Sequence, residues 1–181
     1  MKTADWTLNQ DDGELRILTG VAGPAAKMGH RLTIVMQSWQ AAVAWADGEP
    51  VGAELVVDVD SLQVLNGEGG VTPLSGPEKL VVRANALKSL DAKKHPTITF
   101  RADVVVKTET GYRLEGILQI HGKTRNQVVD LAVDDTGDAW VLSVQAPVTQ
   151  TEFGVKPYSL LMGSMKVADE VTIGFTAKRP Q

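Results

Sequence analysis

The chain has 181 residues, a formal net charge of −4 from 18 basic and 22 acidic side chains, and no cysteine. This length predicts one domain, residues 1–181, with a sizeable core. The lack of cysteine excludes disulfides, a thiol nucleophile and cysteine-ligated metal sites. The acidic balance argues against nucleic acid as a partner, because nucleic acids bind best to basic surfaces.

The beginning of the sequence is polar and acidic, and it lacks the apolar run of a secretory signal. No run of about 18 apolar residues occurs anywhere, so no integral membrane segment is predicted. We therefore expect a cytoplasmic protein.

Apolar and polar residues alternate along most of the chain, which is typical of strands with one buried face. In chain order, the alternation predicts strands around residues 15–17, 32–36, 53–59, 97–107, 111–120, 129–133, 140–148 and 171–176. In segment 97–107, the side chains expected on the buried face are Ile98, Phe100, Ala102, Val104 and Val106. Short polar turns join the later strands, so neighbours are expected to be antiparallel. The series predicts an all-β fold, either a closed barrel or a sandwich.

One segment has the pattern of a helix instead. Ser75 and Glu78 form a capping-box signature, and apolar residues follow at helical spacing. The helix is expected to end before Pro96, because the residue preceding a proline avoids helical angles. A face carrying Leu80 and Leu87 is expected to plug one end of a barrel. The preceding segment, 66–70, is predicted to be a flexible loop.

Motifs of catalysis are not found in the sequence. Segment 121–124, His-Gly-Lys-Thr, ends like a phosphate-binding loop, but Ile117 stands where that motif requires glycine. His30, His95 and His121 fall at predicted turns or strand ends, and we expect none of them to join a metal-type cluster. No catalytic residue, metal site or cofactor is therefore predicted.

The predicted inward side chains are mainly Val, Leu, Ile and Ala, and aromatic residues make up only 5% of the chain. A barrel of eight strands either fills its interior with its own side chains or holds one small ligand. The residues alone leave both interpretations open.

Several segments together resemble the YceI-like family of lipocalin-like, polyisoprenoid-binding proteins. These are Lys-His-Pro-Thr-Ile-Thr-Phe at 94–100, the Gly-x-Leu-x-x-His-Gly pattern within 111–125, Glu-Phe-Gly at 152–154, the closing strand at 169–173 and Gly-His at 29–30. The resemblance implies an antiparallel eight-stranded lipocalin-like barrel with one α-helix near one end. It also implies an amphiphilic isoprenoid lipid, a polyprenyl chain or an isoprenoid quinone, as the ligand inside.

The family resemblance implies which residues contact that lipid. The residues it places along the tunnel are Ile98, Phe100, Tyr112, Leu114, Leu118 and Phe175. To these we add the inward residues of the other strands, which are Leu32, Ile34, Leu55, Val57, Leu142 and Ile173. At the mouth or end of the barrel, the resemblance implies His30, His121, Arg125 and Phe153. A homodimer is a further expectation of the resemblance.

Three classes of function follow from these observations. The first is a lipid-binding barrel for carriage, storage or sensing. The second is a structural or interaction barrel with a self-filled core, whose role would lie in loops such as 66–74. The third is an isoprenoid-modifying enzyme, which would need an inward ionisable group such as His30 or His121.

Overall fold

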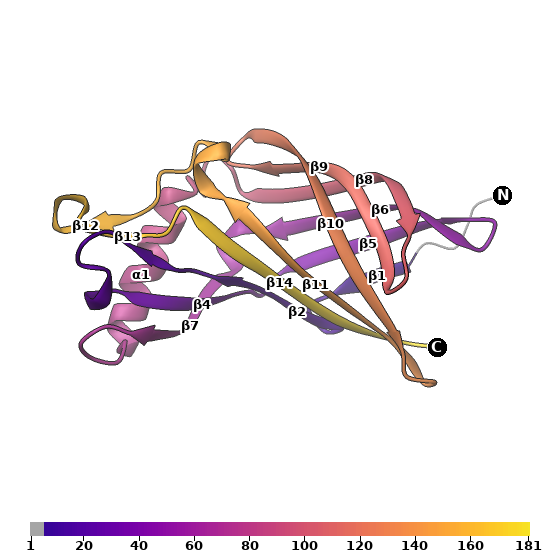
Figure 1. Ribbon diagram of the computed structural model, residues 1–181, viewed down its shortest axis with the longest axis horizontal. Coiled ribbons are helices and arrows are strands. Elements are labelled where there is room, and N and C mark those ends of the chain that lie inside the picture. Colours follow the sequence, from indigo (N-terminus) through magenta and orange to yellow (C-terminus); the bar gives the residue numbers. More distant parts are fainter. Residues whose placement is uncertain (1–5) are drawn as a thin grey trace.

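The computed structural model describes residues 6–181, and most of them belong to one antiparallel sheet of eleven strands (Figure 1). In spatial order the strands are β1 (Trp6–Asn9), β5 (Trp39–Ala46), β6 (Glu49–Asp58), β8 (Thr97–Lys107), β9 (Gly111–Ile120), β10 (Lys123–Asp135), β11 (Ala139–Thr149), β14 (Glu170–Pro180), β2 (Gly13–Leu18), β4 (His30–Met36) and β7 (Leu62–Gly69). Residues 1–5 of the predicted domain lie outside the described part.

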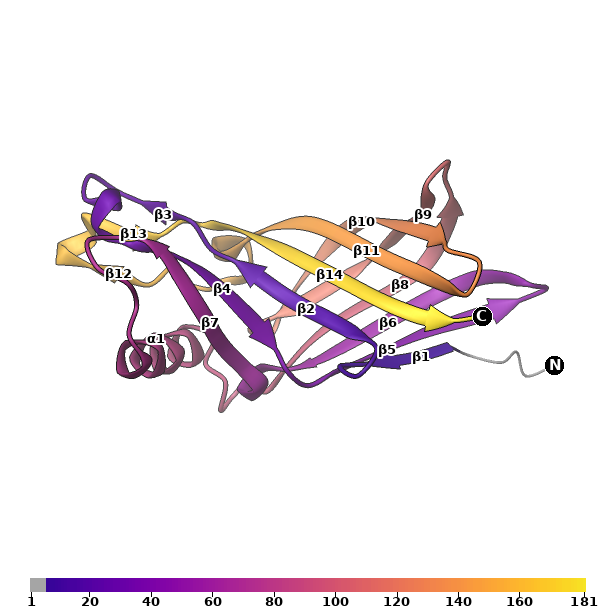
Figure 2. The same ribbon diagram turned by 90° about the horizontal axis from the view of Figure 1, so that it is seen from below.

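Shorter elements gather at one end of the large sheet. A second sheet has the order β12 (Ser159–Leu160), β13 (Met165–Val167) and β3 (Val21–Ala22). It lies at the same end as the helix α1 (Gly76–Ser89), whereas both termini lie at the opposite end (Figures 1 and 2). The single-turn helices are η1 (Ala26–Met28), η2 (Val59–Ser61), η3 (Gln150–Phe153) and η4 (Leu161–Gly163).

The large sheet is curled into a half-barrel because the chain itself bridges distant parts of the strand order. Only Gln37 and Ser38 separate β4 from β5, and only η2 separates β6 from β7. The two breaks lie side by side, since the Gln37 amide donates to the Ser61 carbonyl at 3.2 Å and the Asp58 amide donates to the Ser38 carbonyl at 3.0 Å. A sheet tied in this way must curve, and its concave face encloses the core.

The structure confirms an all-β fold with antiparallel strands and one α-helix, but not the predicted count of eight strands. The three further strands of the large sheet are β1, β5 and β7. The sequence of β5 is rich in alanine, which is depleted in strands. The end of β7, expected to be a flexible loop, is ordered by pairing with β4, where His30 lies opposite Gly69.

A β-bulge changes the face of strand β8 along its length. Ala102 pairs with Gly116, but Val104 pairs with the next residue of β9, Glu115. One extra residue in a strand reverses which side chains point inward. The prediction that Val104 and Val106 share the buried face is therefore wrong: both are exposed, and Val105 packs against the core instead.

Helix α1 begins as predicted, with a reciprocal capping box. The Glu78 amide donates to Ser75 Oγ, and the Ser75 amide donates to Glu78 Oε1, both at 3.3 Å. The predicted apolar face is right for Leu87, which packs against the core, and wrong for Leu80, which is 68% exposed. The side facing the sheet carries Val82 and Ala86 instead.

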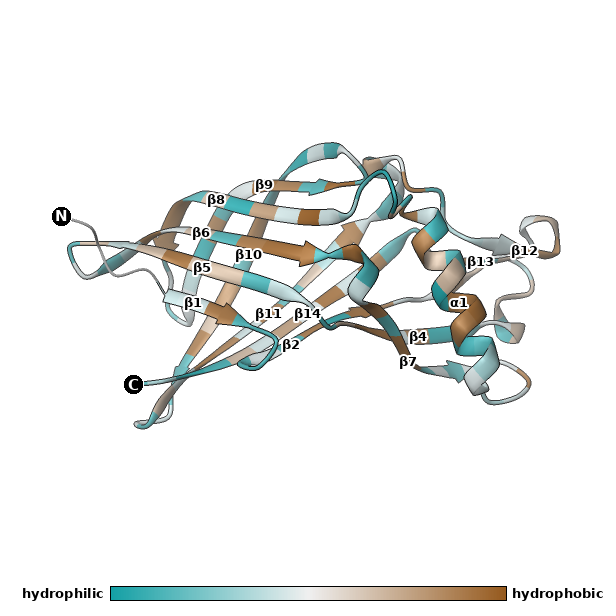
Figure 3. Ribbon diagram, turned by 180° about the vertical axis from the view of Figure 1, so that it is seen from behind, coloured by the Kyte–Doolittle hydropathy of each residue, from teal (hydrophilic) through white to brown (hydrophobic). Residues whose placement is uncertain are grey.

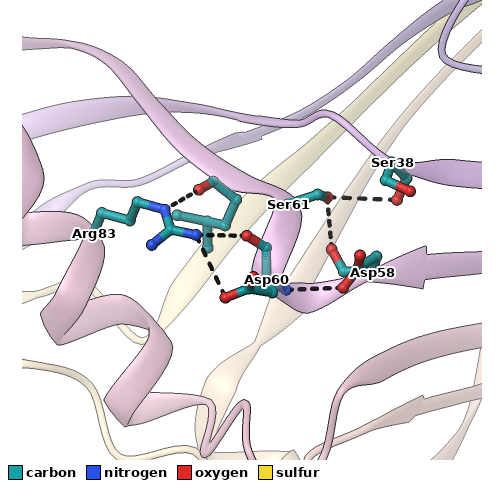
Figure 4. A network of polar contacts seen from close by, with 6 residues as sticks. Ser38, Asp58, Asp60, Ser61 and Arg83 are labelled. Atoms are coloured by element: carbon teal, nitrogen blue, oxygen red, sulfur yellow. Dashed lines mark hydrogen bonds and ion pairs between the residues drawn. The ribbon is translucent and has the colours of Figure 1, made fainter.

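The rotation of α1 is set by one arginine (Figure 4). Arg83 donates from Nε to the Leu62 carbonyl at 2.7 Å and from Nη2 to the Asp60 carbonyl at 2.5 Å. The η2 turn that supplies these acceptors is itself held, because Ser61 Oγ donates to the Asp58 carbonyl at 2.6 Å. With Val82 facing the cavity, Leu80 lies about 160° around the helix from it and points toward solvent.

Candidate functional site

A cavity of about 310 Å³ lies inside the curled sheet, at the end that α1 covers. Its walls come from the large sheet, from α1 and from the small β12–β13–β3 sheet. The strands have brown, hydrophobic stretches beside α1 in Figure 3, and the lining is mainly Leu, Ile and Val. This volume falls at the lower end of the range of natural ligand pockets.

Seven of the twelve predicted ligand-contacting residues line the cavity. They are Leu32, Ile34, Leu55, Val57, Ile98, Leu118 and Ile173. The other five lie outside its lining and belong to the packed core or pack against it; they are Phe100, Tyr112, Leu114, Leu142 and Phe175. The period-two pattern correctly places most of these side chains inward, but it carries no signal for where the interior is filled and where it is hollow.

Of the four residues expected at the mouth or end of the barrel, two line the cavity and two do not. His30 and Phe153 line the cavity. His121 and Arg125 do not, and Arg125 is exposed and donates to the carbonyl of Thr124. The cavity therefore has one histidine on its wall, His30, and that ring is held by a 2.7 Å hydrogen bond between Nε2 and the Thr72 carbonyl.

Polar groups on the cavity wall are few. Besides His30, they include Asn85, Ser89 and Gln150, and Gln150 already donates from Nε2 to the Ala168 carbonyl at 3.0 Å. Within residues 6–181, no polar or charged residue is fully buried. The wall is thus suited to apolar ligand atoms, with polar contacts limited to a few partly exposed positions.

The apolar lining continues to the molecular surface. Tyr158, Leu160 and Met165 belong to the wall, and the first two are partly exposed. Next to them, Leu161 and Met162 lie on the outside in left-handed backbone conformations, with φ of 52° and 56°. An elongated apolar molecule would therefore meet apolar side chains from the surface inward.

Sequence reasoning missed several lining residues. Leu15 and Ile17 belong to a predicted strand, and their alternation was the signal that could have found them. The helix contributes Val82, Ala86 and Leu90, which are spaced four residues apart. Segment 155–167 also supplies lining residues, but its sequence shows neither the two-residue period of a strand nor the 3.6-residue period of a helix.

A second group of side chains lies beside the cavity rather than in its wall. Asp91, His95 and His121 are half-buried, and each offers a ligand atom within 4.8 Å of the other two. The expectation that no histidine would join a metal-type cluster is wrong in this respect. Asp91 and His95 are four residues apart, which was a usable signal, but the approach of His121 depends on the tertiary fold.

Two carboxyl groups have perturbed titration, and both are at the surface. The hydroxyl and amide of Ser75 hold the pKa of Glu78 below its ordinary value. A hydrogen bond from Thr136, with the nearby Lys178 ammonium, lowers the pKa of Asp138. Neither carboxyl lines the cavity, so neither shift indicates chemistry there.

A curled antiparallel sheet around an apolar cavity, with one helix at its end, defines the lipocalin-like class of folds. The YceI-like domain model matches residues 6–178, and the chain belongs to this family. No curated protein matches the sequence significantly.

Solved structures agree with this fold. BcnA of Burkholderia cenocepacia superposes with a TM-score of 0.69 at 19% identity, over 92% of this chain and 96% of that protein. The YCEI protein of Campylobacter jejuni gives a TM-score of 0.59 at 14% identity, over 82% and 84% of the two chains. No helix within residues 6–181 is both long and apolar enough to cross a membrane.

Proposed function

We propose that the protein binds an amphiphilic isoprenoid lipid, a polyprenyl chain or an isoprenoid quinone, with its apolar chain inside the curled sheet. The binding serves carriage, storage or sensing of the lipid rather than its chemical conversion. The observation that carries this proposal is the 310 Å³ apolar cavity beside α1.

The energetics of such binding need no special residue. Burying one CH₂ contributes about 0.8 kcal/mol, so one five-carbon isoprene unit contributes roughly 4 kcal/mol before the cost of association. The cost of association is about 4–15 kcal/mol, so three units, which contribute roughly 12 kcal/mol, would support micromolar binding when that cost is near the lower end of its range. Specificity would come from cavity shape and from the polar groups near the surface.

The cavity also favours this proposal over a barrel with a self-filled core. Protein interiors pack as densely as organic crystals, and voids much larger than a water molecule are few. A hollow of this size, lined by Leu32, Ile98 and Leu118 among others, leaves apolar side chains without packing partners. An apolar ligand would supply those partners.

A matched pair of variants on strand β9 tests the proposal. Leu118 lines the cavity and is 9% exposed, whereas its neighbour Ile117 is 51% exposed. Leu118→Glu would place a carboxyl against the ligand, so we expect at least a 100-fold (~3 kcal/mol) loss of affinity. Ile117→Glu should leave the affinity unchanged. The measurement is calorimetric titration with farnesol and with a short-chain isoprenoid quinone.

The pair is informative only in folded proteins. Thermal unfolding followed by circular dichroism checks this, and Leu118→Gln serves if the glutamate variant does not fold. Equal affinity of folded Leu118 and Ile117 variants would refute binding inside the sheet. A wild-type protein that binds neither probe, even after delipidation, would refute the proposed ligand class.

A further inference from the structure

Asp91, His95 and His121 are brought together by two turns. Asp91 follows the end of α1, and its carbonyl accepts hydrogen bonds from the amides of Lys94 at 3.0 Å and His95 at 2.8 Å. This closed turn places the Asp91 and His95 side chains at one location. His121 arrives from the two-residue turn between β9 and β10, where Ile120 pairs with Lys123.

Both turns hold non-glycine residues in the left-handed backbone region. Asp91 has φ of 49°, and His121 has φ of 55° followed by Gly122 at 73°. Asparagine and glycine are the usual residues of such a hairpin turn. Histidine is less favoured than asparagine at this turn position. Its imidazole lies near Asp91 and His95, at the end of α1, which indicates a role beyond turn formation.

The imidazoles of His95 and His121 are close together, and one of their nitrogens is buried without a hydrogen-bond partner. The ring centroids of His95 and His121 are 4.9 Å apart at an interplanar angle of 61°. The Nδ1 atom of His121 is buried without a hydrogen-bond partner. A buried ring nitrogen normally finds a partner, because leaving it unsatisfied costs about 1–3 kcal/mol. A cation bound between the rings would satisfy such a nitrogen.

We propose that Asp91, His95 and His121 bind one divalent transition-metal ion, of which zinc is the best match. Two imidazoles and one carboxylate are ligands that zinc accepts, whereas magnesium and calcium prefer oxygen atoms alone. Zinc bonds to these atoms are about 2.0–2.2 Å long. The ligand atoms now lie within 4.8 Å of one another, so side-chain rotations that bring them about an ångström closer would complete the site. Three protein ligands leave a further position for water.

The ion would join the C-terminal end of α1 to the β9–β10 turn. The residues preceding Asp91 and His121 are Leu90 and Ile120, and both line the cavity. Metal binding would therefore fix one wall of the cavity. The ion would hold the C-terminal end of α1, whereas Arg83 holds the middle of the helix through its hydrogen bond to Leu62. This inference stands apart from the identity of the lipid, because none of the three ligands lines the cavity.

The test uses the full chain without a histidine tag, stripped by a chelator and then dialysed against Zn²⁺ or Co²⁺. We expect one Zn²⁺ per chain by elemental analysis, with a dissociation constant of about 1 µM or lower. The Co²⁺ form should show visible d–d absorption. Zn²⁺ should also raise the unfolding temperature, since a ligand that binds only the folded state stabilises it.

Three variants make the test specific. Asp91→Asn and His121→Asn keep residues that tolerate the left-handed backbone, so both should fold. Each is expected to weaken Zn²⁺ binding at least about 50-fold, because loss of a direct ligand should cost at least as much as loss of an outer-shell partner, for which about 10–100-fold is typical. His30→Asn is the control, because His30 is the one histidine outside the cluster, and it should bind Zn²⁺ as the wild type does.

Two results would overturn the proposal. One is a wild-type chain that takes up no stoichiometric Zn²⁺ or Co²⁺ at about 100 µM metal. The other is folded Asp91 and His121 variants that bind Zn²⁺ as tightly as the His30 variant, which would place the ion elsewhere.

Discussion

The interior of the curled sheet is filled by packed side chains in one half and is hollow in the other. In the half outside the cavity lining, large aromatic side chains fill the interior: Trp39 is 2% exposed and meets Phe175 edge to face, with ring centroids 5.2 Å apart. In the half beside α1, medium-sized aliphatic side chains line a cavity of about 310 Å³. The strand pattern is the same in both. Most of the cavity wall is aliphatic, although Phe153 also belongs to it, so the same strand pattern supports both a filled and a hollow interior.

Further aromatic contacts follow along the same inner face, because Trp6 shares its strand face with the buried Leu8, and Trp45 shares its face with the buried Trp39. Trp6 and Trp45 pack with centroids 4.8 Å apart, and the Arg179 guanidinium lies 4.5 Å above the Trp6 ring. Such aromatic and cation–π contacts add to stability beyond area burial. The hollow half has α1, held by Arg83, and the small sheet instead. We therefore expect most of the stability to come from the filled half and the binding function from the hollow half.

The largest expected effect comes from emptying the filled half. Trp39→Ala should lower the free energy of unfolding by about 3–5 kcal/mol, because it removes the largest fully buried side chain. Trp39→Phe should cost much less, since the Trp39 Nε1 atom has no hydrogen-bond partner to lose. Urea denaturation measures both. An alanine variant within about 1 kcal/mol of wild type would contradict the assignment of stability to this half.

The anchor of α1 should give the next largest effect. Arg83→Ala removes charge-assisted hydrogen bonds to two backbone carbonyls, so we expect a loss of about 1.5–3 kcal/mol and faster amide exchange in α1. Arg113→Ala is the matched control, because its ion pair with Asp130 is exposed and worth about 0–1 kcal/mol. If both variants exchange equally in α1, then Arg83 does not hold the helix.

A pair of leucine truncations compares the halves directly. Leu142 is packed in the core outside the cavity, whereas Leu118 already faces the cavity, and both are buried. Truncation creates a new cavity in one case and enlarges an existing one in the other. We expect Leu142→Ala to cost about 1–2 kcal/mol more than Leu118→Ala in chemical denaturation. Equal losses would mean that the hollow is filled or collapsed in solution.

The smallest effect concerns pH and the start of α1. Because the folded state lowers the pKa of Glu78, this residue contributes stability above its unfolded pKa, and the contribution fades as pH falls through the folded pKa. Ser75→Ala should raise the pKa of Glu78 toward its ordinary value, as measured by NMR titration. The same variant should flatten the acid limb of the stability profile slightly. An unchanged Glu78 titration would show that the capping box does not form.

The strands were predictable where polar and apolar residues alternate strictly, as in β9 and β14. They were missed where composition hides the period: β5 is rich in alanine, and β7 ends in glycines. The bulge in β8 could not be predicted from β8 itself. It accompanies Gly116 on the neighbouring strand, where an added Cβ would lie 2.3 Å from the Arg101 carbonyl oxygen.

The candidate site was predictable only in part, for a related reason. Alternation shows that Leu118 and Leu142 both point inward, but only the tertiary structure shows that one faces the hollow and the other a packed core. The pairing of His95 with His121 joins segments that are separate in sequence. The spacing of apolar residues predicts which way a side chain points. Whether that side chain faces a cavity or joins a cluster depends on the residues that other segments place opposite it.

The most direct test of the hollow half is mass spectrometry of an organic extract from freshly purified, undenatured protein, produced in a host that makes polyprenyl lipids and isoprenoid quinones. We predict an isoprenoid species in near-stoichiometric amount from the wild type and from Ile117→Glu, and its loss from folded Leu118→Glu. A clean extract from the wild type, or the same lipid from both variants, would contradict isoprenoid binding in this cavity.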